Sequence, residues 1–140
     1  MSRSLAFYIA LPGTTAEAME HWQEVFGGEL EILRYADTSI EGMPFEPDPQ
    51  AVAHATLTLP IGVIAGGDAM DDEGDYPVQG TAYSLLYTTS TPDEARGYAE
   101  KLVEAGGTIG MPFEQAPWGG WYGQVFDRFG VMWAFSCDND

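Results

Sequence analysis

Hydrophobic and polar residues follow two patterns along this chain, short apolar runs and stretches with helical spacing, and the order of these patterns occurs twice. A short apolar run at residues 5–11 precedes a stretch where apolar residues recur at spacings of three and four. Residues 82–87 precede a second stretch of that kind. That spacing is typical of a helix lying on one face of a sheet. Strand-like runs follow each stretch, so the pattern predicts an α+β fold of two βαβββ modules.

The expected helix boundaries are marked in the same way in both halves. Residues 14–17 and 91–94 each begin with Thr and end with Glu, the spacing of a capping box that satisfies free backbone N–H groups. Gly27-Gly28 and Gly106-Gly107 follow the helical stretches, and glycine readily takes the left-handed conformation that ends a helix.

The two expected helices are one-sided. The first has its apolar face at Ala18, Met19, Trp22, Val25 and Phe26, and its polar face at Glu17, Glu20, His21 and Glu24. This pattern predicts a surface position for His21. The second has its apolar face at Ala95, Ala99, Leu102 and Val103.

The remaining strands are indicated by alternation and by turns. Residues 52–59 alternate cleanly, with His54 on the threonine side. The other strand-like runs are residues 29–35, 63–65, 108–114, 123–127 and 131–137. We expect one domain, with module one at about residues 4–69, a linker at 70–80 and module two at about 81–137.

Two segments lie outside the repeat. Residues 37–50 carry three prolines and several acids, which predicts a loop. Residues 71–75 are acidic but lack the Gly and Glu positions of a helix-loop-helix calcium site, so a solvated linker is the simpler interpretation.

Charge and cysteine content narrow the function classes. The chain carries 22 acidic and 5 basic residues, a net charge of −17, so we expect no binding to nucleic acid or to anionic membranes. No apolar run approaches the roughly 18 residues of a membrane span. Cys137 is the only cysteine, which excludes an internal disulfide and fits a cytoplasmic location.

The motifs resemble those of the vicinal oxygen chelate superfamily (glyoxalase, bleomycin resistance, dioxygenase), and within it the PhnB-like group. The matching segments, in order, are Ala18-Met19, residues 23–30, His54-Ala55, Trp118-Gly119, Tyr122-Gly123, residues 127–131 and Trp133. The resemblance implies two βαβββ modules whose mixed sheets cup a cavity, and a homodimer. In the enzymes of this family, a divalent metal is held by residues on the first and last strand of each module.

The residues at those ligand positions argue against a conventional metal site. Alignment on Trp22 puts Phe7 at the first-strand position, and a slide of one residue gives Ala6 or Tyr8. Alignment on Gly130 puts Ala134 at the last-strand position. The opening strand of module two offers only Ser84, and the closing strand of module one has no carboxylate before Asp68. We therefore expect no metal and no other cofactor.

His54 and Asp68 are the remaining polar candidates. His54 is either a surface histidine or a cavity residue that donates a hydrogen bond or acts as a general base. The PhnB-like pattern also has a histidine there. Asp68 either caps a turn or contacts a ligand.

The aromatic segment of residues 118–122 is the other candidate. Aromatic rings separated by glycines can form a wall against a planar ligand, or they can be core or interface packing. We include Trp118 and Tyr122 among the candidate ligand-binding residues and interpret Trp121 as packing. Trp133 and Cys137 are expected in the core, and Arg128 in a local turn.

The leading hypothesis is a metal-free protein that binds or sequesters a small apolar or planar molecule through His54, Asp68, Trp118 and Tyr122. The alternative is a metal-dependent lyase, isomerase or dioxygenase with unconventional ligands among His54, Asp68 and Glu114. An interaction protein that uses its acidic segments to bind a basic partner is a third possibility.

Overall fold

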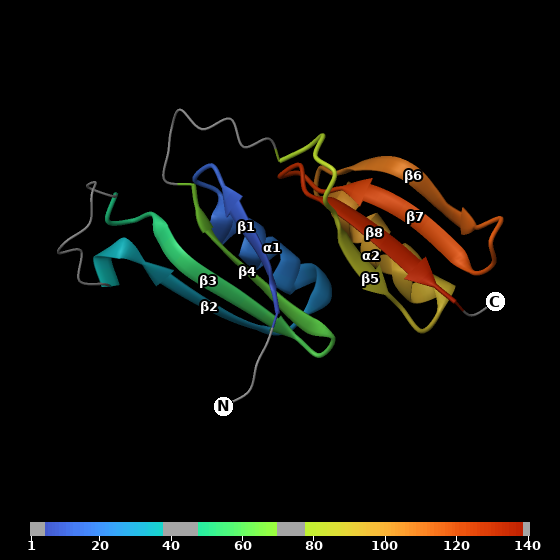
Figure 1. The fold of residues 1–140 in the computed structure, drawn as a ribbon, viewed down its shortest axis with the longest axis horizontal. Coiled ribbons are helices and arrows are strands. Elements are labelled where there is room, and N and C mark those ends of the chain that lie inside the picture. Colours follow the sequence, from blue (N-terminus) through green and yellow to red (C-terminus); the bar gives the residue numbers. More distant parts are fainter. Residues whose placement is uncertain (1–4, 38–47, 70–77, 139–140) are drawn as a thin grey trace. The chain divides into compact units, whose positions relative to one another are not determined.

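The structure is a computed structural model that describes residues 5–37, 48–69 and 78–138 of the 140-residue chain (Figure 1). The elements, in chain order, are β1 (Phe7–Leu11), α1 (Thr15–Phe26), β2 (Glu29–Arg34), η1 (Tyr35–Asp37), β3 (Val52–Leu59), β4 (Gly62–Asp68), β5 (Leu85–Thr88), α2 (Pro92–Glu104), β6 (Thr108–Gln115), β7 (Trp121–Phe126) and β8 (Met132–Cys137). The predicted linker at residues 70–80, including the acidic segment 71–75, lies outside the described residues except for its last three.

The chain divides into two compact units, Met1–Asp75 and Tyr76–Asp140, called module one and module two below. Module one has a four-stranded sheet in the order β1-β4-β3-β2, and module two has one in the order β5-β8-β7-β6. In both, the first strand pairs in parallel with the last, and the other pairings are antiparallel. The predicted α+β fold of two βαβββ modules is confirmed.

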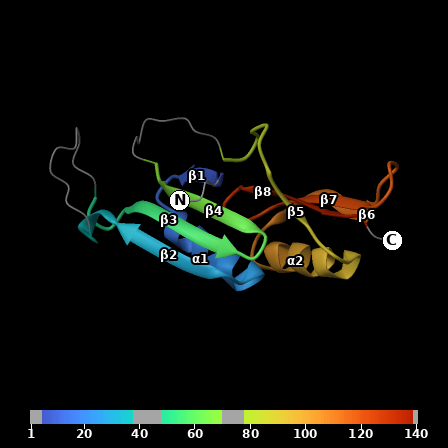
Figure 2. The same cartoon turned by 60° about the horizontal axis from the view of Figure 1, so that its bottom comes forward.

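Among the described residues, each module has one α-helix, which lies on one face of its own sheet (Figure 2). We call the opposite side of each sheet its open face. The two helices begin differently. Thr91 caps α2 as predicted, since its hydroxyl accepts a hydrogen bond from the Glu94 backbone N–H at 3.2 Å. Thr14 makes no such bond, and Asp68 accepts a hydrogen bond from the Thr15 backbone N–H instead, at 3.1 Å. The capping box predicted for the first helix is therefore wrong.

The core of module one is built around α1. Trp22 and Met19 are fully buried against β3 and β4, which contribute Ala55, Leu57 and Ile64. His21 is also buried, at 6% exposed, so its predicted surface position is wrong. It lies three residues after Ala18 and four before Val25, and both of these are buried. The buried arc of α1 is therefore wider than the purely apolar positions indicated.

The core of module two rests on β8. Trp133, Phe135 and Cys137 are buried as predicted. Asp127, in the turn before β8, is 4% exposed, and its carboxylate accepts hydrogen bonds from the Val131 backbone N–H and the Trp133 indole N–H, both at 3.0 Å. α2 buries only Ala95 and Leu102, so this helix covers its sheet less completely than α1 does. No helix among the described residues is long and apolar enough to cross a membrane.

Candidate ligand-binding faces

Two adjacent glycines in β4 identify the two faces of the sheet in module one. A Cβ atom at Gly66 would lie 3.2 Å from Cε of Met19, which belongs to α1. A Cβ atom at Gly67 would lie 2.9 Å from the hydroxyl oxygen of Tyr8. Successive residues of a strand point to opposite faces, so Tyr8 and Gly67 belong to the open face.

The open face of module one presents an aromatic pair above small residues. The rings of Tyr8 and His54 are stacked, with centroids 5.8 Å apart and planes at 24°. Tyr8 stands opposite Ala65 in the β1–β4 register, and Ala65 and Gly67 have little or no side chain to fill the space between β1 and β3. His54, predicted as a cavity or surface residue, is exposed on this face. It can offer a ring N–H or an acceptor nitrogen to a ligand.

Asp68 lies on the other face, beside α1. One carboxylate oxygen accepts the hydrogen bond from Thr15, and the other accepts one from the Val52 backbone N–H at 2.9 Å. The structure therefore does not bring Asp68 and His54 together, although both were candidates for one site. Asp68 joins the start of α1 to the start of β3, so it caps a helix and not the turn that the sequence suggested.

The open face of module two is richer in hydroxyl and amide groups. Tyr122 pairs with Ser136 in the β7–β8 register, and the Ser136 hydroxyl lies 2.9 Å from that of Thr88. The Tyr122 hydroxyl accepts a hydrogen bond from the Gln124 side-chain amide at 3.0 Å. Beside these groups lies Leu86, which is 63% exposed. The face thus combines an apolar surface with fixed polar groups.

Trp118 is presented by the turn between β6 and β7. The turn is closed by a hydrogen bond from the Ala116 backbone N–H to the Gly120 carbonyl, and Gly120 has a φ of +71°, which favours glycine. The Trp118 ring meets that of Tyr122 edge to face, with centroids 5.9 Å apart, yet Trp118 remains 74% exposed. The two predicted aromatic residues are therefore brought together.

The neighbouring aromatic and basic residues have other surroundings. Trp121 stacks on Phe113, with ring centroids 5.8 Å apart, and the Arg96 guanidinium lies 4.7 Å from the centroid of the Trp121 ring. These contacts fit the packing interpretation of Trp121. Arg128 is exposed, and its guanidinium lies 4.2 Å from the Phe129 ring centroid within the turn before β8.

The first and last strands of the two modules do not offer the donors that a divalent metal needs. Their open-face residues are Tyr8, Ala10, Val63, Ala65, Gly67, Leu86, Thr88, Met132, Ala134 and Ser136. None has an imidazole, carboxylate or thiolate group, which are the usual metal ligands in proteins. Phe7 lies on the helix side of the sheet, opposite Ile64. Tyr8, and not Phe7, is therefore the residue that the first strand places on the open face. Within the described ranges, no group of three or more His, Cys, Asp or Glu residues is placed to hold a metal ion.

Gln124 is a polar residue of the site that the sequence analysis missed. It lies two residues after Tyr122 in the same strand, so alternation alone puts both on one face. Tyr8 was considered only as a one-residue slip of the alignment. The alternation of β1, with Ile9 half-buried and Leu11 fully buried on the helix side, would have selected it.

The fold and the strand order define a two-module protein of the glyoxalase type. The chain belongs to the Glyoxalase/Bleomycin resistance protein/Dioxygenase superfamily, whose sequence model matches residues 2–135.

Among individual proteins, the chain is 30% identical to Protein YjdN of Escherichia coli, over 92% of this chain and 91% of that protein. Protein PA1353 from Pseudomonas aeruginosa has a similar structure, with a TM-score of 0.81 and 27% identity over 99% of this chain and 100% of that one. A Bacillus cereus PhnB protein, described as a putative 3-demethylubiquinone-9 3-methyltransferase, has a TM-score of 0.74 and 25% identity over 96% and 99% of the two chains. The PhnB-like resemblance seen in the sequence is confirmed.

Proposed function

We propose that this protein binds a small apolar or planar molecule without a metal ion. The observation that carries the proposal is the edge-to-face pair of the exposed Trp118 and the half-buried Tyr122 beside the Gln124 amide. An indole that is 74% exposed leaves a large apolar surface in water, and covering it with a ligand is favourable. The hydrogen bond between Gln124 and Tyr122 fixes polar groups next to that surface, which is the usual composition of a small-molecule site.

The open face of module one supports the same kind of ligand. Tyr8 and His54 form a second exposed aromatic surface, and the imidazole adds a polar group that a ligand can reach. In a binding protein, His54 donates or accepts a hydrogen bond. In an enzyme it would act as a general base, and it would need a partner that orients its ring.

Metal analysis separates the proposal from the metal-dependent alternative. The purified protein is incubated with trace nickel, zinc, manganese and iron, dialysed, and its metal content is measured. We expect much less than one metal per chain, because the open-face positions of β1, β4, β5 and β8 carry no strong ligand. A ratio near one that His54→Ala abolishes would overturn the proposal and favour a metal enzyme.

Binding is tested with N-phenyl-1-naphthylamine, a neutral aromatic fluorophore that brightens in apolar surroundings. Trp118→Ala and Tyr122→Ala are expected to weaken its binding by roughly tenfold each, as for aromatic residues that anchor an interface. Tyr83→Ala is the matched control, since Tyr83 is 75% exposed in the same module and precedes β5. Equal binding by all four proteins, wild type included, would refute the proposed site.

A further inference from the structure

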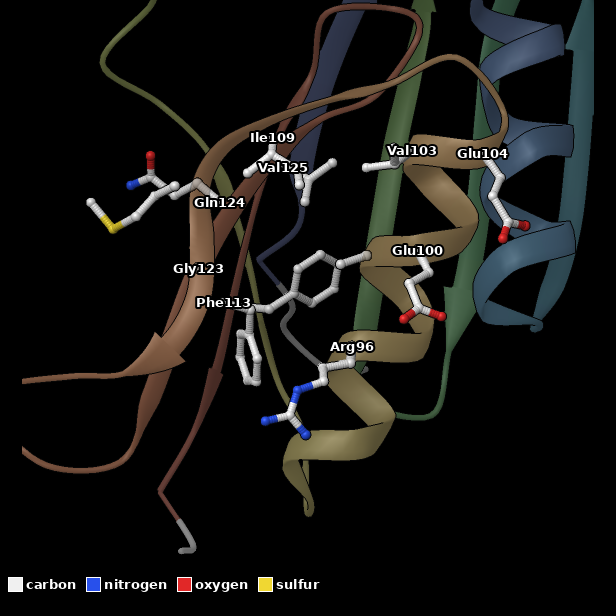
Figure 3. Close-up of a pocket in the computed structure, with 12 residues that line it drawn as sticks. Arg96, Glu100, Val103, Glu104, Ile109, Phe113, Gly123, Gln124 and Val125 are labelled. Carbon is white, nitrogen blue, oxygen red and sulfur yellow. The ribbon is translucent and has the colours of Figure 1, made fainter.

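Module two contains a pocket on the helix side of its sheet, away from the open face described above. Its volume is about 260 Å³, and it lies between α2 and strands β6, β7 and β8 (Figure 3). Ala99 and Val103 line it from the helix, and Ile109, Phe113 and Val125 line it from the strands. The volume is just below the range of about 300–1,000 Å³ found for drug-sized ligands, so the pocket suits a small molecule with an apolar body.

The pocket exists because the two helices differ at equivalent positions. Counted from the N-cap threonines, Thr14 and Thr91, the position of Trp22 in α1 corresponds to that of Ala99 in α2. By the same count, Phe26 corresponds to Val103. In module one Trp22 is fully buried. In module two the smaller side chains leave the space between helix and sheet open, and an apolar space that lacks packing atoms is a good host for an apolar molecule.

Charged residues at the pocket favour a cation. Glu100 and Glu104, one helical turn apart on α2, line it from the helix, and Arg96 is the basic residue among the lining side chains. The Arg96 guanidinium is paired with Asp93 at 2.9 Å, and Figure 3 shows it at the Phe113 end of the pocket, apart from the two glutamates. The net charge of −17 adds a negative field over the whole chain. Figure 3 shows the Glu100 and Glu104 carboxylates on the side of α2 away from Ile109 and Phe113, so the two charges stand at the rim of the pocket and not inside it. An ammonium group at this rim is attracted by two carboxylates, whereas a carboxylate is attracted only by an arginine that already has a partner.

We propose that this pocket binds a small organic monoamine, with its apolar or aromatic body between α2 and β6 and its ammonium group beside Glu100 and Glu104. The pocket and the proposed open-face site lie on opposite sides of the sheet and share Gln124, but Ala99→Trp changes only the pocket and Trp118→Ala changes only the open-face site. Either site can therefore fail without the other.

The test compares three matched probes: phenylbutylammonium, phenylbutanol and phenylbutyrate. Binding is followed by the backbone amide shifts of the isotope-labelled full chain in nuclear magnetic resonance spectra. We expect shifts confined to α2, β6 and the helix-facing residues of β7. The expected order of affinity is the ammonium probe first, then the alcohol, then the carboxylate.

Two variants test the named residues. Ala99→Trp gives α2 the residue that α1 carries at the equivalent position, so it should fill the pocket and abolish binding of all three probes in a folded protein. Val103→Phe serves the same purpose if Ala99→Trp does not fold. The double variant Glu100→Gln with Glu104→Gln should lower the affinity for the ammonium probe by about threefold to tenfold, as expected for two exposed charges. The affinity for the alcohol probe should not change.

Glu20→Gln with Glu24→Gln is the control, because these two exposed residues have the same spacing on α1. Three results would overturn the proposal: binding that persists in the filled variant, preference for the carboxylate probe, or no shift at α2 and β6 with any probe. The last result, together with a dimer whose dissociation is promoted by Ala99→Trp, would show that a second copy of the chain occupies the pocket.

Discussion

The role of Asp68 can be separated from ligand binding by its effect on stability. Its two carboxylate oxygens accept backbone hydrogen bonds at 3.1 Å and 2.9 Å from residues that are far apart in the chain, Thr15 and Val52. Asp68→Ala would remove both bonds, and it would remove a negative charge from the N-terminus of α1. A hydrogen bond to a charged group contributes about 1.5–3 kcal/mol, and a charge at a helix terminus about 0.3–1 kcal/mol.

The site is only partly buried, so water replaces some of the lost bonding, and we expect the free energy of unfolding to fall by about 2–4 kcal/mol. Asp68→Asn keeps one acceptor oxygen and loses the charge, so the expected loss is about half of this. The assay is urea unfolding at neutral pH followed by far-ultraviolet circular dichroism, with the change taken from the midpoint at constant slope.

Asp93→Ala is the matched control for Asp68→Ala. Asp93 is 95% exposed in its ion pair with Arg96, so its removal should change the free energy of unfolding by less than about 0.5 kcal/mol. Binding of N-phenyl-1-naphthylamine to folded Asp68→Asn should match the wild type. Unchanged stability of Asp68→Ala together with lost binding would refute the structural role and return Asp68 to the ligand site.

Three further predictions concern packing, a buried carboxylate and a buried phenol. Gly66→Ala should lower the free energy of unfolding by about 1–3 kcal/mol in the same urea assay, because the added Cβ would lie 2.5 Å from the Ile9 carbonyl oxygen. Gly62→Ala, with nothing within 4 Å, is its control. Asp127→Asn should cost about 1–3 kcal/mol, because an amide cannot accept hydrogen bonds at both positions as the carboxylate does. A variant as stable as the wild type would contradict this reasoning. Burial, reinforced by the hydrogen bond to Tyr98, raises the pKa of Tyr87 above its ordinary value of 10.0. As the pH rises through about 10, the unfolded chain gains from ionising this phenol and the folded chain does not, so stability should fall. Tyr87→Phe should show a shallower fall in alkaline urea titrations, and an identical slope would count against the assignment.

The order of strands and helices could be predicted because each element carries its own periodic signal. The strand Val52–Leu59 was predicted with the same limits that the structure shows, since its alternation and its flanking turn residues agree. Thr91 was predicted correctly as a cap because its hydroxyl and the Glu94 N–H are three residues apart, a local relation. Thr14 has the same spacing to a following Glu, but the carboxylate of Asp68, in β4, accepts the hydrogen bond from the Thr15 N–H. A contact between residues 53 positions apart leaves no local signal.

Residue type alone does not predict the burial of His21 or the side of the sheet on which Tyr8 lies. A histidine among glutamates resembles a surface residue, and only its spacing from Ala18 and Val25 reveals that it belongs to the buried arc of α1. Sequence alignment left both Phe7 and Tyr8 as candidates for the first-strand ligand position, because the two aromatic residues are adjacent and differ by one step in register. A slip of one residue exchanges the two faces of a strand, so the sheet pairing was needed to decide between them.

The pocket in module two shows how a repeated fold can acquire a binding site without new elements. Both modules share strand order and helix position, so their helices must bury comparable faces against comparable sheets. In module one the buried side chain of Trp22 packs against the sheet, whereas module two carries Ala99 at the equivalent position. Nearby, Ile109 and Met111 remain 60% and 45% exposed. Exposed apolar area on a sheet edge is costly unless something covers it. The proposed occupant of the pocket would cover this surface, and the sequence carries the difference from which the proposal starts: a Trp in one repeat and an Ala in the other.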